Sequence, residues 1–172
     1  GVGDQAGFYY IYGLFSCPGG DVLIVDNNNV KRWYAETGEV RTLLPRQKID
    51  GVWTDLETPT TDFDCRYWYV MKPENPDVIG QFSLSDGILV KYVTIENMNM
   101  KIVQGLHAYK DENTAEEKLM IFGARGYGYN DNAIFIVDVE TSAFTQIYDS
   151  TGKHSKAPGN CGGEYDVGGL CY

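Results

Sequence analysis

The chain has 172 residues, a formal net charge of −10 at pH 7, 43% hydrophobic residues and 22% charged residues. This length and composition exclude a disordered chain and predict one globular domain, residues 1–172, with a hydrophobic core. The negative charge excludes nucleic acid and anionic membrane surfaces as expected partners, and no apolar run approaches the roughly 20 residues of a membrane-spanning helix. Because the sequence begins at Gly1 without a charged and apolar leader, we expect a mature, processed form.

The first part of the chain predicts a meander of short antiparallel strands. Residues 8–15 and 22–25 are mostly apolar, and the predicted strands 8–15 and 21–26 flank a Cys-Pro-Gly-Gly turn. Residues 30–34 and 40–44 flank a Glu-Thr-Gly turn. Glycine, proline and asparagine between aromatic and β-branched runs are typical of hairpins.

The rest of the chain continues the same pattern. The predicted strands are 65–71, 78–84, 88–95, 101–109, 119–124, 133–139 and 144–148. The charged run at 110–118 predicts a solvated loop. The sequence therefore predicts an all-β protein.

Three hairpins can be laid over one another at a period of about 55 residues, starting at Phe8, Arg66 and Lys118. We predict repeats over residues 7–63, 64–117 and 118–148, followed by a glycine-rich tail at 149–172 that contains two cysteines.

The segments 21–40 and 132–148 resemble strand–turn–strand units of β-propeller blades, although they lack the Gly-His and Trp-Asp dipeptides of the WD40 family. The resemblance implies antiparallel blades of four strands. Propellers close with about four to eight blades, and three repeats are too few. The resemblance therefore implies a homo-oligomer or a filament, in which other chains complete the exposed sheet edges.

A second resemblance leaves an alternative open. Gly51-Val52-Trp53 resembles the Gly-x-Trp signature of lipocalins, and Val137-Asp138-Val139 lies near the place of that family's Thr-Asp-Tyr motif. This resemblance implies an eight-stranded barrel that carries a small hydrophobic ligand, with Cys65 paired to a C-terminal cysteine.

The four cysteines, Cys17, Cys65, Cys161 and Cys171, form no C-x-x-C pair, so a zinc ribbon or a thioredoxin-like site is not expected. Their even number predicts two disulfides in an oxidising compartment, and hence a secreted, extracellular protein. Three pairings are open. We expect one bridge to tie the tail to the body.

Catalytic signals are sparse. The two histidines, His107 and His154, have no histidine partner at metal-ligand spacing, and neither a G-x-S-x-G elbow nor a phosphate loop occurs. We therefore expect no catalytic residues and no cofactor, with an extracellular hydrolase as a further alternative. The Asn/Asp turns at 26–29 and 130–132 suit turn geometry, with Ca²⁺ binding as the alternative.

The 13 tyrosines and 3 tryptophans are the best functional signal. Strand alternation turns some of them outward, where their half-polar rings suit interfaces and sugar stacking. The predicted ligand-binding residues are Tyr127, Tyr129, Trp33, Tyr34 and Trp68. The predicted function is a non-catalytic binding and assembly protein that self-associates through sheet edges and aromatic faces, with carbohydrate or an extracellular polymer as a further partner.

Overall fold

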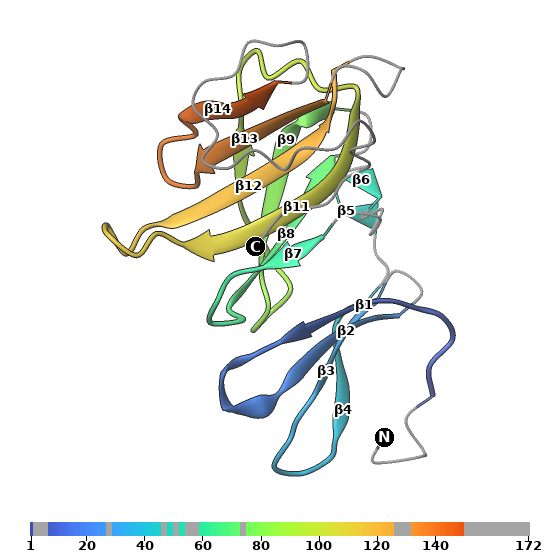
Figure 1. Ribbon diagram of the computed structural model, residues 1–172. Coiled ribbons are helices and arrows are strands. Elements are labelled where there is room, and N and C mark those ends of the chain that lie inside the picture. Colours follow the sequence, from blue (N-terminus) through green and yellow to red (C-terminus); the bar gives the residue numbers. More distant parts are fainter. Residues whose placement is uncertain are drawn as a thin grey trace, which may run out of the picture.

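The strands form three four-stranded antiparallel sheets and one two-stranded sheet (Figure 1). The structure is a computed structural model that describes residues 1, 7–26, 29–45, 48–49, 52–53, 59–72, 75–125 and 132–149. In these residues the only helical element is a single 3₁₀ turn at Pro18–Gly20. The predicted all-β class is confirmed.

The first sheet is a meander of consecutive strands, as the sequence predicts. It contains β1 (Ile11–Ser16), β2 (Val22–Asp26), β3 (Asn29–Trp33) and β4 (Val40–Leu44), in that order. β5 (Lys48–Ile49) and β6 (Val52–Trp53) then pair as a small two-stranded sheet between the first and second sheets of the chain.

The second and third sheets repeat this topology. The second contains β7 (Thr60–Thr61), β8 (Tyr67–Lys72), β9 (Asn75–Ser83) and β10 (Leu89–Thr94). The third contains β11 (Ile102–Lys110), β12 (Glu117–Ala124), β13 (Asn132–Asp138) and β14 (Phe144–Asp149).

The sheets divide the chain one strand earlier than the predicted repeats at 64–117 and 118–148. Those breaks fall after β7 and after β11, which are the first strands of their sheets. The hairpin at 8–26 supplies the first and second strands of its sheet, whereas the hairpins at 66–82 and 118–138 supply the second and third. A two-residue strand such as β7 leaves no alternating pattern to align.

One turn geometry recurs between the third and fourth strands of every sheet. Each turn has six residues and two backbone hydrogen bonds. The N–H of the first residue donates to the carbonyl of the sixth, and the N–H of the fifth residue donates to the carbonyl of the first. The three turns are 34–39, 83–88 and 138–143. The fifth residue has a positive φ in each case: Gly38, Gly87 and Ser142. The same turn, with Ala115 at its fifth position, joins β11 to β12.

The second sheet lies between the other two and is packed on both faces. Along β8, Trp68 and Val70 contact a core shared with the first sheet, whereas Tyr69 and Met71 contact a core shared with the third. Successive side chains of a strand point to opposite faces, so a strand buried on both sides reads as an unbroken apolar run. The first strands β7 and β11 also meet, and Thr60 Oγ1 accepts the Ala108 N–H at 3.2 Å.

The described strands do not close into one barrel, which corrects the lipocalin-like alternative. The Gly-x-Trp segment lies in part on β6, a two-residue strand in a sheet of its own. Within the described residues there is also no helix long and apolar enough to cross a membrane.

We predict that Ala115→Gly stabilises the protein by about 0.5–1 kcal/mol. Left-handed backbone costs a residue with a Cβ roughly 1–2 kcal/mol, and the larger entropy that glycine loses on folding offsets part of that gain. The measurement is the free energy of unfolding in urea. Gly87→Ala is the matched reverse change: its φ is +74° and a Cβ there would lie 3.1 Å from Leu44 Cδ2, so it should be destabilising. Equal stabilities for all three proteins would contradict this account of the turns.

Candidate functional site

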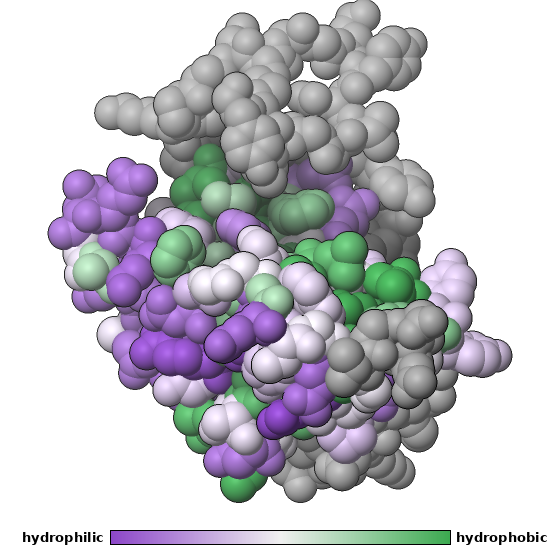
Figure 2. Space-filling model, turned by 90° about the horizontal axis from the view of Figure 1, so that it is seen from below, coloured by the Kyte–Doolittle hydropathy of each residue, from purple (hydrophilic) through white to green (hydrophobic). Residues whose placement is uncertain are grey.

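The largest group of exposed apolar side chains lies on β1 and the residues just before it. We call this group the aromatic edge; it consists of Phe8, Tyr9, Tyr10, Ile11, Tyr12 and Leu14. Their exposed fractions run from 42% for Phe8 to 84% for Tyr9. β1 is the outermost strand of its sheet, so its far side has no strand partner among the described residues. In the view from below, with the first sheet nearest the viewer, green apolar side chains reach the surface in groups beside purple hydrophilic ones (Figure 2).

Asp26 at the end of β2 anchors the start of the aromatic edge. Its Oδ1 accepts the N–H groups of Tyr9 and Tyr10, both at 2.7 Å. Its Oδ2 forms an ion pair with Lys31 Nζ at 2.5 Å, and Lys31 also donates to the Gly7 carbonyl at 2.8 Å. One buried carboxylate and one lysine therefore hold residues 7–10 against the sheet.

The charge of Asp26 is stabilised inside the protein. Burial opposes ionisation, but the hydrogen bonds from Lys31, Tyr10 and Tyr9 outweigh it and lower the pKa of Asp26. Asp26 is only 2% exposed. Removing one partner of such a buried pair destabilises a protein more than removing one partner of a surface ion pair, because the remaining charge is left uncompensated.

A β-bulge directs Tyr12 outward. Ile11 pairs with Asp26 and Gly13 with Val25, so Tyr12 is an extra residue without a partner on β2. Bulges of this kind re-aim side chains at sheet edges. The Tyr12 ring contacts the Tyr10 ring, with centroids 4.6 Å apart.

The aromatic edge is also electrically neutral. Residues 5–20 contain none of the chain's 14 basic and 24 acidic residues. The edge strand β10 has exposed apolar side chains as well, with Val90 50% and Tyr92 43% exposed, but Lys91 lies between them. Natural edge strands are commonly protected by such charges, and β1 has none.

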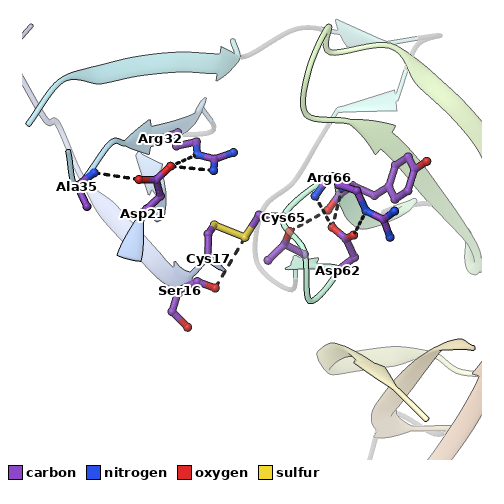
Figure 3. The surroundings of a disulfide bond; sticks show 10 residues. Ser16, Cys17, Asp21, Arg32, Ala35, Asp62, Cys65 and Arg66 are labelled. Carbon is purple, nitrogen blue, oxygen red and sulfur yellow. Dashed lines mark hydrogen bonds and ion pairs between the residues drawn. A yellow bond between two sulfur atoms is a disulfide. The ribbon is translucent and has the colours of Figure 1, made fainter. Parts of the chain in front are cut away.

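The Cys17–Cys65 disulfide fixes the first sheet to the second (Figure 3). Cys17 follows β1 and Cys65 follows β7, so the bridge joins the first turns of two neighbouring sheets across 48 residues of sequence. In a chain-entropy model such a loop contributes up to about 4 kcal/mol to stability. Asp62 shapes the Cys65 turn by accepting the N–H groups of Arg66 and Tyr67 at 2.6 and 2.7 Å.

This pairing corrects one implication of the lipocalin resemblance, because Cys65 bonds to Cys17 and not to a C-terminal cysteine. The expected bridge between the tail and the body used Cys161 or Cys171, and both lie outside the described residues. Because Cys17 and Cys65 are the only cysteines outside the tail and they bond to each other, the expected bridge between the tail and the body is wrong.

The predicted ligand-binding residues do not come together in one described place. Tyr127 and Tyr129 lie outside the described residues. Trp33 and Tyr34 are half-buried at the end of β3. The Tyr34 ring centroid lies 5.3 Å from the guanidinium group of Arg32 and 5.4 Å from that of Arg41.

Trp68 is buried, which corrects the expectation that it faces a ligand. Its exposed fraction is 0%, and the Phe15 ring meets it edge-on with centroids 5.3 Å apart. Both faces of β8 are covered, so no side chain in the middle of this strand reaches solvent. The alternation of apolar and polar residues along one strand cannot show that a second sheet covers its other face.

The oxygen-rich turns carry no described metal site. Asp26, the acidic member of the first turn, is engaged by Lys31 and two backbone N–H groups. Asn27, Asn28, Asn130 and Asp131 lie outside the described residues. Elsewhere in the described chain, no three His, Cys, Asp or Glu side chains are grouped as metal ligands.

The aromatic edge was visible in the sequence only in part. Tyr9, Tyr10 and Tyr12 stand out as an aromatic cluster, but nothing in the sequence shows that β1 ends a sheet. The stronger signal is the long uncharged stretch at 5–20 in an otherwise acidic chain. No protein-family model matches this chain, and no curated protein matches it in sequence.

We predict that Asp26→Asn destabilises the protein by about 3 kcal/mol at pH 7, because it leaves Lys31 without its buried partner. The folded-state pKa of Asp26 is lowered, so its contribution is complete above the unfolded pKa of ~4 and is lost as the pH falls below it. The difference between the two proteins in urea unfolding should therefore shrink on acidification below pH ~4. Asp64→Asn is the control, because its ion pair with Arg66 is largely exposed and contributes less than about 1 kcal/mol. A difference that stays constant with pH would contradict the assigned role.

Proposed function

We propose that this protein is an extracellular, non-catalytic binding and assembly protein whose contact surface is the aromatic edge. The observation that carries the proposal is the coincidence of three properties in one segment: exposed aromatic side chains, a sheet edge with no strand partner among the described residues, and no charge. Exposed tyrosines suit interfaces because each ring offers a large apolar face and one polar tip.

The anchoring of this segment supports the proposal. Asp26 and Lys31 fix the backbone of residues 7–10, so a partner meets a surface that is already ordered. Preorganisation lowers the entropy cost of binding. A loop that only faces solvent does not require a buried ion pair to hold its backbone in place.

The arrangement of the sheets supports assembly of a propeller-like kind. Each sheet is a four-stranded meander, the second is packed between its neighbours, and the same turn closes the third and fourth strands of all three. The first strands β7 and β11 lie together, as inner strands of adjacent blades do in a propeller. Three such units do not make a ring, so the proposal includes completion by another chain.

The extracellular assignment rests on the disulfide, because such bonds persist in oxidising compartments. Carbohydrate is a second candidate partner, and the exposed Tyr10–Tyr12 ring pair favours it. Ring faces of this kind stack on the apolar faces of sugars.

We predict that Tyr12→Lys abolishes the binding activity of the protein without unfolding it. A charge in the middle of the aromatic edge must be desolvated on contact, and this penalty exceeds the energy of a few side-chain contacts. The measurements are molar mass by light scattering over a concentration series and co-sedimentation with insoluble polysaccharide.

Phe63→Lys is the matched control, because Phe63 is 70% exposed but lies in the turn between β7 and β8. It should behave as the wild-type protein does in both measurements. The proposal fails if Tyr12→Lys leaves both measurements unchanged, or if Phe63→Lys impairs them equally.

A further inference from the structure

We propose that the partner of the aromatic edge is a second copy of this chain, and that two copies meet edge to edge about a two-fold axis at Tyr12. This inference rests on the proposed function and adds to it the identity of the partner and the geometry of the contact. In a two-fold contact each residue i meets residue j and each j meets i, so one self-complementary patch is sufficient.

Charge is the first argument for a second copy. Two chains of net charge −10 repel each other over most of their surfaces. The stretch at 5–20 is uncharged, and Asp26 is neutralised by Lys31 beneath it. A cationic or anionic partner finds no charge to recognise here, whereas a second neutral edge meets no repulsion.

Complementarity of side chains is the second argument. Phe15 points inward onto Trp68, and a Cβ at Gly13 would lie 3.2 Å from the Phe15 ring, so these positions face the interior. The exposed apolar positions from Tyr10 through β1 are therefore Tyr10, Ile11, Tyr12 and Leu14. An antiparallel two-fold contact centred on Tyr12 places Tyr12 against its own copy and Tyr10 against Leu14 of the other chain. Aromatic and aromatic–aliphatic side-chain contacts are stabilising when they are removed from water.

The bulge at Tyr12 determines whether backbone or side-chain interactions dominate this contact. A bulge interrupts regular strand pairing at an edge and so limits a long continuous ladder. Side chains rather than backbone hydrogen bonds therefore provide most of the contact. This arrangement closes as a dimer and leaves no free aromatic edge for further chains.

The experiment uses charge complementation at the axis, in the full chain. Tyr12→Lys and Tyr12→Glu chains are each measured alone and then in a 1:1 mixture, by light scattering on a sizing column, alongside the wild-type protein. We expect the wild type to reach twice its 19.2 kDa chain mass as concentration rises, each variant alone to remain at the chain mass, and the mixture to recover the double mass. Recovery occurs only if residue 12 of one chain lies next to residue 12 of the other.

Control variants at other exposed positions test whether the contact lies at Tyr12 or elsewhere on the surface. Phe63→Lys and Phe63→Glu chains should dimerise alone as the wild type does, and circular dichroism of every variant should retain the wild-type β spectrum. A Val90→Lys chain tests the second apolar edge strand, β10, and should also dimerise.

Several results would overturn the inference. A wild-type protein that stays at the chain mass at all concentrations excludes a second copy; binding to polysaccharide by that monomer would still leave the proposed function standing. Loss of the double mass in Val90→Lys but not in Tyr12→Lys would place the contact on β10. If the wild-type protein dimerises but the mixture of Tyr12→Lys and Tyr12→Glu chains does not regain the double mass, Tyr12 lies away from the two-fold axis. Masses above that of the dimer would mean that the contact continues from chain to chain and does not form a closed dimer.

Discussion

Burial of the second sheet on both faces is the constraint on which the rest of this structure depends. β8 sends Trp68 and Val70 into one core and Tyr69 and Met71 into another, so two separate cores meet on a single strand. The first and third sheets are each held by one of these cores. Loss of the second sheet would therefore remove the packing of both neighbours at once. The Cys17–Cys65 bridge strengthens the side where the first sheet contacts the second.

The first sheet is attached by its inner face, and this attachment leaves its edge strand open. Phe15 and Leu23 are drawn into the core, while Tyr12 and Leu14 on the same hairpin remain in solvent. The buried Asp26–Lys31 pair then fixes the approach to β1. A buried carboxylate is costly unless it is hydrogen-bonded. The Asp26 carboxylate accepts hydrogen bonds from the N–H groups of Tyr9 and Tyr10, and its charge therefore holds these two residues in place. The core packing and the exposed aromatic edge are thus two consequences of one arrangement of strands.

The sequence was sufficient to predict the longer strands and most turns, but it did not predict the two-residue strands β5, β6 and β7 or the way in which the sheets pack on one another. Apolar alternation and the glycines at positions 38 and 87 locate hairpins, because those signals act within a few residues. The burial of Trp68 depends on the first sheet, which covers the face of β8 that carries this side chain. The choice of Cys65 as the partner of Cys17 likewise depends on how two sheets pack. The predicted repeat boundaries differ from the sheet boundaries by one strand, and the two-residue strand β7 left no pattern from which the first of them could be placed. The aromatic edge was missed as a unit because exposure depends on which strand ends a sheet.

Hydrogen exchange of backbone amides, measured at low and high protein concentration, reports both on the packing of the second sheet and on the covering of the aromatic edge. The account predicts that the amides of β8 and β9 exchange slowest at every concentration, because the sheet that contains them is packed on both faces. It also predicts that the amides of residues 11–16 that are not hydrogen-bonded to β2 exchange quickly in dilute solution and slowly in concentrated solution, as the aromatic edge becomes covered. Exchange in β8 as fast as in the edge strands, or exchange at those amides of residues 11–16 that does not change with concentration, would contradict the account.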